Sequence, residues 1–131
     1  MDAGLHVAAA TETPWIFPDL ELTQQIGRPV DQIAGGMDGR GRANSETPAW
    51  VLGQLLTAEQ GLRALTGAAW ALGDDGRRGH LALGALGDVT ILSGDVIGAT
   101  PDEIRAMSVV ATIVDGIVAY CSDVEVCGLG R

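Results

Sequence analysis

A two-residue Asp-Gly loop between two runs of β-branched residues constrains the fold of this chain more than any other feature. Val109 to Val114 and Ile117 to Tyr120 are rich in Val and Ile, and Asp115-Gly116 separates them. Both central residues of a type I′ turn need a positive φ, which Asp and Gly adopt at low cost. The sequence therefore predicts an antiparallel hairpin, preceded by short strands at Leu81 to Leu83 and Val89 to Leu92.

The first third of the chain is predicted to hold a strand, a helical region and a linker. Leu5 to Ala10 is a short apolar run typical of a buried strand. One helix or two short ones are expected over residues 20–34, where Pro29 interrupts the pattern. Residues 35–42 are rich in glycine and polar, without the glycine spacing of a nucleotide-binding loop, and predict a flexible linker.

Two further helices have recognisable N-terminal caps. Thr57 and Gln60 have the spacing of a capping box at the start of a helix that runs to Leu72. Thr100 is the expected cap of the second helix, and Pro101 suits its first position. The first of these helices is predicted to bury one apolar stripe, formed by Ala58, Leu62, Leu65, Ala69 and Leu72.

Composition argues against several classes of partner. The 131 residues include 17 acidic and 8 basic side chains, a net charge of −9, and every basic residue is Arg. This charge argues against nucleic acid or an anionic membrane as a partner. No apolar run approaches the ~20 residues of a membrane span, and the start lacks the basic region of a signal peptide. We therefore expect a cytoplasmic protein, with Cys121 and Cys127 as ordinary thiols that bind no zinc.

Three stretches of the sequence resemble metal-dependent amidohydrolases. Residues 79–92, Gly-His-Leu-Ala-Leu-Gly-Ala-Leu-Gly-Asp-Val-Thr-Ile-Leu, resemble the Gly-Ser-Leu-Glu-x-Gly-Lys-x-Ala-Asp-Leu-Val-Val-Leu signature near the C-terminus of that superfamily. Residues 62–70 resemble its Ala-Leu-Arg-Ala-Tyr-Thr-x-x-Ala-Ala helix, and residues 101–120 its closing hairpin. The resemblance is strongest to the amidohydrolase 3 branch, with its N-acyl and formamide hydrolases. The departures from the signature are His80, Ala82, Ala85 and Gly87.

The resemblance implies an α/β plus β fold that is incomplete in this chain. Residues 1–76 would form the last β/α part of a (β/α)8 TIM barrel of a metal hydrolase. Residues 77–131 would form the C-terminal half of a small composite β-sandwich. A whole barrel needs about 250 residues, so we interpret the chain as a C-terminal fragment. Its full-length parent would hydrolyse carbon–nitrogen bonds of a small amide-type substrate, and the fragment alone would be inactive.

Glu12 is the candidate catalytic and metal-binding residue that the resemblance implies. The last barrel strand of the family ends in a Ser-Asp or Thr-Asp pair, whose Asp binds the metal and accepts the proton of the attacking water. Thr11-Glu12 follows the predicted strand at the same place. Glu is one methylene longer than Asp, and a misplacement of about 1 Å can cost a hundredfold in rate. Glu12 is therefore either a substitute for that Asp or a loop carboxylate in a decayed site.

The remaining ligands of the family are not in this chain. The family uses a divalent metal, with zinc the first choice, held by a His-x-His pair and two further histidines. The sequence has two histidines, His6 and His80. We expect His6 to be a packing or edge residue of the strand and His80 to lie in the sandwich. The adjacent acids Asp74 and Asp75 are expected to be solvated turn residues and not a catalytic carboxylate pair. The isolated chain is expected to hold no metal.

A second class of function stays open at this point. The chain could be a standalone, non-enzymatic α+β module that associates with itself or binds a partner through open sheet edges. The apolar content of 47% is high for a protein of this size. If the chain is a fragment, we expect it to be poorly soluble or oligomeric when isolated, because an incomplete barrel and half a sandwich leave apolar surface uncovered.

Overall fold

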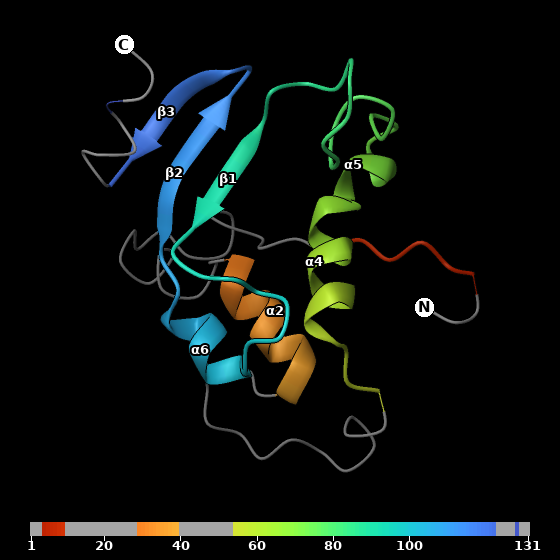
Figure 1. Ribbon diagram of the computed structural model, residues 1–131. Coiled ribbons are helices and arrows are strands. Elements are labelled where there is room, and N and C mark those ends of the chain that lie inside the picture. Colours follow the sequence, from red (N-terminus) through yellow and green to blue (C-terminus); the bar gives the residue numbers. More distant parts are fainter. Residues whose placement is uncertain (1–3, 10–28, 40–53, 123–127, 129–131) are drawn as a thin grey trace, which may run out of the picture.

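A computed structural model of the protein describes residues 4–9, 29–39, 54–122 and 128. Within these ranges, helices lie below and beside a small antiparallel sheet (Figure 1). The elements, in chain order, are α2 (Pro29–Asp38), α4 (Ala58–Thr66), α5 (Ala68–Ala71), β1 (Val89–Leu92), α6 (Pro101–Ala106), β2 (Val109–Val114) and β3 (Ile117–Cys121).

The hydrophobic core lies where α2 packs between α4 and α6. Ile33 on α2 and Ile104 on α6 are its largest fully buried side chains. A Cβ atom on Gly61 of α4 would lie 3.2 Å from Cγ2 of Ile33, so the absence of a side chain at Gly61 lets the two helices approach closely. Around these residues the core is completed by Val30, Ala34, Ala58, Val96 and Met107.

Helix α2 begins at Pro29, because the first turn needs no backbone donor at that position. This start is compatible with the second of the two short helices predicted over residues 20–34. The helix continues through Gly35 and Gly36 to Asp38, where a flexible linker was predicted. Packing supports these glycines: the Leu56 amide donates to the Gly36 carbonyl oxygen at 2.7 Å. Gly39, with φ of +68°, follows the helix. Residues 20–28 and 40–42 lie outside the described ranges.

Both predicted caps are confirmed. The Gln60 amide donates to Thr57 Oγ1 at 3.2 Å, and the Thr57 amide donates to Gln60 Oε1 at 2.9 Å. At α6, the Glu103 amide donates to Thr100 Oγ1, and Glu103 Oε2 accepts from the Thr100 amide at 2.8 Å. The predicted single helix to Leu72 is wrong in its second half, because it breaks at Gly67 into α4 and α5. Leu72, the last residue of the predicted apolar stripe, is exposed and does not take part in it.

The predicted hairpin is confirmed in the three-stranded sheet, whose order is β1-β2-β3. Asp115 has φ of +50° and Gly116 of +75°, as a type I′ turn requires. The turn is held in place by the preceding loop: the Asp115 amide donates to Asp88 Oδ1 at 2.9 Å, and the Gly116 amide to the Gly87 carbonyl at 3.0 Å. A Cβ atom at Gly87 would lie 2.8 Å from the Gly116 nitrogen, so this contact requires glycine.

Two predicted strands do not form. The described part of the first, residues 4–9, is outside any strand, and Leu5 and Val7 are exposed. Residues 81–83 are also outside any strand, with Leu81 and Leu83 exposed. A strand is stable only when a neighbour takes its backbone hydrogen bonds. No such neighbour lies beside either segment among the described residues, although both have strand-like sequences.

The cysteine prediction is also wrong for Cys121. This residue ends β3, and its sulfur is disulfide-bonded. The sequence has one other cysteine, Cys127, which lies outside the described residues. The local sequence does not show whether a cysteine is a free thiol or part of a disulfide. The outcome depends on how closely the folded chain brings two sulfur atoms together.

An ion pair fastens α6 to the end of α2. Arg105 Nη1 donates to Asp38 Oδ2 at 2.8 Å and Nη2 to Oδ1 at 2.9 Å, a bidentate arrangement. The two side chains are 27% and 12% exposed. The hydrogen bonds to Asp38 raise the pKa of Arg105 above its ordinary value, so the guanidinium keeps its positive charge. Asp102 adds a third contact to Arg105 at 3.2 Å.

Arg105→Ala should lower the free energy of unfolding by about 1–3 kcal/mol, between the values for exposed and buried pairs. Arg105→Lys should recover only part of this loss, because an ammonium group cannot form the bidentate contact. The measurement is urea denaturation. Arg63→Ala is the matched control, since its pair with Glu59 lies on the exposed surface of α4. An equal loss in both alanine variants would show that the Arg105–Asp38 pair contributes no more to the free energy of unfolding than an exposed ion pair.

Glu103 should make the stability of α6 depend on pH. Hydrogen bonds from the Thr100 amide and then the Thr100 hydroxyl lower the pKa of Glu103. Its stabilising effect is complete above the ordinary glutamate pKa of about 4.3 and disappears as the pH falls through the lowered value. Denaturation of the wild type and Glu103→Gln at pH 7 and at pH 3 should therefore show a difference that shrinks at low pH. Thr100→Ala should lower the free energy of unfolding by about 1 kcal/mol at pH 7. A difference between the wild type and Glu103→Gln that does not change with pH would contradict this role of Glu103 in the cap.

Candidate functional site

The segment that leads to the candidate base lies against the junction of α4 and α5. The Ala9 amide donates to the Ala64 carbonyl oxygen at 2.9 Å. A Cβ atom on Gly67 would lie 3.5 Å from the Val7 carbonyl oxygen, so the segment passes close to the break between the helices. Glu12 itself lies outside the described residues. Its predicted role therefore stays a prediction.

His6 has the packing role that the sequence predicted. Its ring stacks on the indole of Trp70, with centroids 4.7 Å apart and planes inclined by 10°. Trp70 lies on α5, the short helix after the break at Gly67. Together with the Ala9 hydrogen bond, this stack fixes residues 6–9 on the helices without any strand pairing.

Both histidines of the sequence line one shallow cleft of about 240 Å³. His80 lies in the turn after α5, where its Nδ1 is 3.0 Å from the Arg78 carbonyl oxygen. His80 was predicted to lie in the sandwich, and its approach to His6 has no signal in the sequence because the two histidines are far apart in the chain. Other polar residues that line the cleft are Arg63, Asp75 and Arg78.

The charges around this cleft largely cancel. Arg78 Nε is 2.9 Å from Asp74 Oδ2 and 3.9 Å from Asp88 Oδ2. Arg63 pairs with Glu59 at 2.8 Å. Asp75 is exposed, as expected for a solvated turn acid, whereas Asp74 is half-buried and held by Arg77 and Arg78. Among the described residues, both arginines that line the cleft are paired with carboxylates, and Asp75 is the single acidic residue of the lining.

The comparison with known families decides the class of the protein. A model described as the amidohydrolase family matches residues 40–120, more than half of the 131-residue chain. The chain belongs to the amidohydrolase family. No curated protein and no solved structure matches it.

The family match confirms the resemblance seen in the sequence. It includes the stretches at residues 62–70 and 79–92 and ends at Tyr120, in β3. These stretches form α4 with the start of α5, and the region that leads into β1. The match begins after Glu12, so it carries no information on the predicted base. Membership places the protein among hydrolases of carbon–nitrogen bonds and leaves the substrate open.

The amidohydrolase family is typically metal-dependent, but the described residues do not fit a metal. Among them, no group of three or more His, Cys, Asp or Glu side chains is placed to hold an ion. His6 is stacked on Trp70, and His80 faces a backbone carbonyl. Four protein ligands, or three with a water, are normal for zinc. The described helices also include none that is long and apolar enough to cross a membrane.

The isolated chain should bind less than one divalent metal ion per molecule. The physical reason is the ligand count, since Glu12 is the one residue of the chain that the family pattern assigns to the metal. Elemental analysis after purification in the presence of zinc, and again after dialysis, checks this expectation. About one zinc per chain, lost in Glu12→Ala and retained in a His80→Ala control, would contradict it.

Proposed function

We propose that this chain is the C-terminal segment of an amidohydrolase that acts on non-peptide carbon–nitrogen bonds, and that it is inactive alone. The family match over residues 40–120 is the observation that carries this proposal. In the parent, residues 1–76 would be the last β/α part of a TIM barrel and residues 77–131 part of a β-sandwich. The substrate would be a small molecule with an amide-type bond.

The packing of residues 6–9 supports this assignment of the first segment. They lie on α4 and α5, held by the Ala9–Ala64 hydrogen bond and the His6–Trp70 stack. A barrel strand followed by its helix needs such contact between the strand and the helix face. Neighbouring strands of a parent would complete the hydrogen bonding, and the apolar Leu5 and Val7 would then be covered.

Glu12 would be the general base of the complete site. It follows the segment that would be the last barrel strand, and barrel enzymes place reacting groups at the carboxyl ends of their strands. Its carboxylate would accept the proton of the attacking water as the carbonyl carbon is attacked. The other groups of the site, including those that hold the family's metal, would come from the rest of the parent.

A standalone module is the second candidate, and one observation favours it. Helices α2, α4 and α6 form a common core around Ile33 and Ile104 without any further chain. A core of this kind is what an independently folding module needs. This reading accounts for the helices, but it gives no role to the family signature that precedes β1.

Translation of the genomic DNA upstream of Met1, in all frames, separates the two candidates. Further β/α units and a His-x-His motif, in frame or after one frameshift, are expected if the chain is part of an amidohydrolase. A promoter and a ribosome-binding site directly before Met1, without such units, would instead support the module. The second result would remove the proposed catalytic role.

In a catalytically active parent, Glu12→Gln should lower turnover by about 10²–10⁴-fold, the usual contribution of a general base. Gln keeps the size of the side chain, so the thermal unfolding temperature should not change. Glu12→Asp distinguishes the two readings of the residue. A site adapted to the longer side chain should lose activity, and a decayed Asp site should gain it. Equal turnover in the parent and both variants would make Glu12 a bystander.

A further inference from the structure

Three aspartates of the sequence, Asp38, Asp75 and Asp115, are each followed by glycine. An Asp-Gly pair can rearrange without any enzyme. The glycine amide nitrogen bonds to the side-chain carboxyl carbon of the aspartate, and its proton leaves with the carboxyl hydroxyl as water. Water then opens the resulting cyclic imide at either carbonyl, which gives aspartate or isoaspartate with no net change in composition. Glycine favours the reaction because no Cβ atom hinders the approach of its nitrogen.

Two of these three sites are held against the reaction. The Gly39 amide donates to a carbonyl oxygen of α2 at 2.8 Å, and Arg105 binds both carboxylate oxygens of Asp38. In the hairpin turn, the Gly116 amide donates to the Gly87 carbonyl oxygen at 3.0 Å. Each of these glycine nitrogens must give up its hydrogen bond before it attacks, which should slow the reaction by about tenfold.

The third site lacks both restraints. Asp75 and Gly76 are the two central residues of an exposed turn after α5, which the Arg77 amide closes by donating to the Asp74 carbonyl oxygen at 3.0 Å. Within the described part of the chain, the Gly76 amide donates no hydrogen bond and Asp75 forms no ion pair. A Cβ atom on Gly76 would meet nothing within 4 Å, so the turn has room to bring the carboxyl group to the nitrogen.

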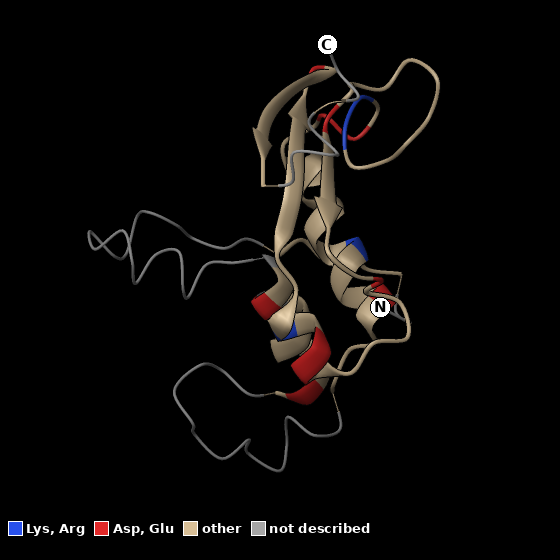
Figure 2. Cartoon of the chain, turned by 60° about the vertical axis from the view of Figure 1, so that its left-hand side comes forward, with Lys and Arg blue, Asp and Glu red and all other residues tan. Residues whose placement is uncertain are grey.

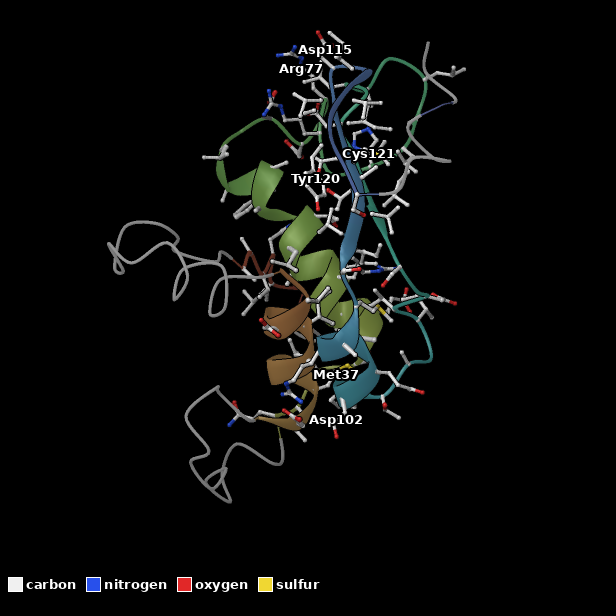
Figure 3. The ribbon with its side chains drawn as sticks, turned by 90° about the vertical axis from the view of Figure 1, so that its left-hand side faces the viewer. Met37, Arg77, Asp102, Asp115, Tyr120 and Cys121 are labelled. Carbon is white, nitrogen blue, oxygen red and sulfur yellow. The ribbon has the colours of Figure 1, made fainter. Side chains whose placement is uncertain are left out.

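The adjacent acid, Asp74, is restrained. Its Oδ2 lies 2.9 Å from Arg78 Nε and its Oδ1 3.7 Å from Arg77 Nη1. Figure 2 shows acidic and basic residues together in the loop that follows α5. Asp74 is also followed by a residue with a side chain, which hinders the approach of the next nitrogen. Figure 3 shows Arg77 at the opposite end of the molecule from Met37, so the site after α5 and the site at the end of α2 react independently.

We propose that Asp75 is the residue of the folded chain that is modified to isoaspartate. The product keeps its negative charge, but the main chain gains one carbon atom in the turn and the side chain loses one. Asp75 lines the cleft that contains His6 and His80. The modification therefore changes the geometry of the turn that forms this cleft. This chemistry goes beyond the proposed hydrolase and needs neither Glu12 nor a parent chain.

Peptide mapping of the full chain, incubated in neutral buffer with and without urea, tests the proposal. Trypsin places the three sites in separate peptides, residues 1–40, 64–77 and 106–131, because it cuts after arginine except before proline. An isoaspartyl peptide has an unchanged mass, a shifted retention time and a bond that endoproteinase Asp-N does not cut. The folded chain should form isoaspartate at Asp75 about tenfold faster than at Asp38 or Asp115. In urea, where the protecting hydrogen bonds are lost, the three rates should agree within about threefold.

Asp75→Glu separates Asp75 from Asp74, which lies in the same peptide. Glu keeps the charge, but its longer side chain would have to close a larger ring, so the isomerised peptide 64–77 should be lost. Circular dichroism shows whether this variant keeps its fold, and the comparison of the three wild-type peptides needs no variant. Equal rates at the three sites of the folded chain, or a faster rate at Asp38 or Asp115, would overturn the proposal. So would a folded chain that forms no isoaspartate at Asp75, or an Asp75→Glu variant that still gives the isomerised peptide.

Discussion

The close crossing of α2 with α4 and α6 is the contact on which the rest of the described structure depends. Ile33 and Ile104 are fully buried there, and Gly61 allows α4 to approach the α2 backbone. The sheet is joined to this core mainly by the segments that connect β1 to α6 and α6 to β2, and less by packing of its faces. Val96 and Met107, which flank α6 in the chain between β1 and β2, are both buried in the core. Loss of the helix crossing would therefore release the sheet as well.

The features that the sequence predicted correctly depend on residues close together in the chain. The Thr57 and Thr100 caps each need one partner three residues later, and the hairpin needs Asp115-Gly116 between two β-branched runs. The Glu103 half of the second cap was overlooked, although the Thr-x-x-Glu spacing was present. In such cases the stabilising hydrogen bonds lie within a few residues of the sequence that signals them.

The wrong predictions involve partners that are distant in the sequence. Residues 5–9 and 81–83 have strand-like sequences, but a strand needs a neighbouring strand to take its hydrogen bonds. Gly35 and Gly36 were predicted to lie in a linker, yet both are helical, and Gly36 is supported by contacts with Leu56. The cleft that joins His6 with His80 depends on the turn after α5 folding back, so that Gly79 lies close to the Thr66 carbonyl at the end of α4. The sequence has no local signal for any of these contacts.

Family membership and the lack of a metal cluster in the described residues are compatible for a physical reason. In a barrel hydrolase the reacting groups come from the ends of several strands, so each β/α unit contributes only one or two of them. The matched residues 40–120 lie beyond the segment that leads to Glu12, and they supply helices and a sheet. A family signature in such a region reflects packing of the scaffold. Asp88, which matches the Asp of the signature, is an example, since its Oδ1 accepts a hydrogen bond from the Asp115 amide in the hairpin turn. Recognition of the family therefore rests on residues that hold the fold, and the role proposed for Glu12 needs a test of its own.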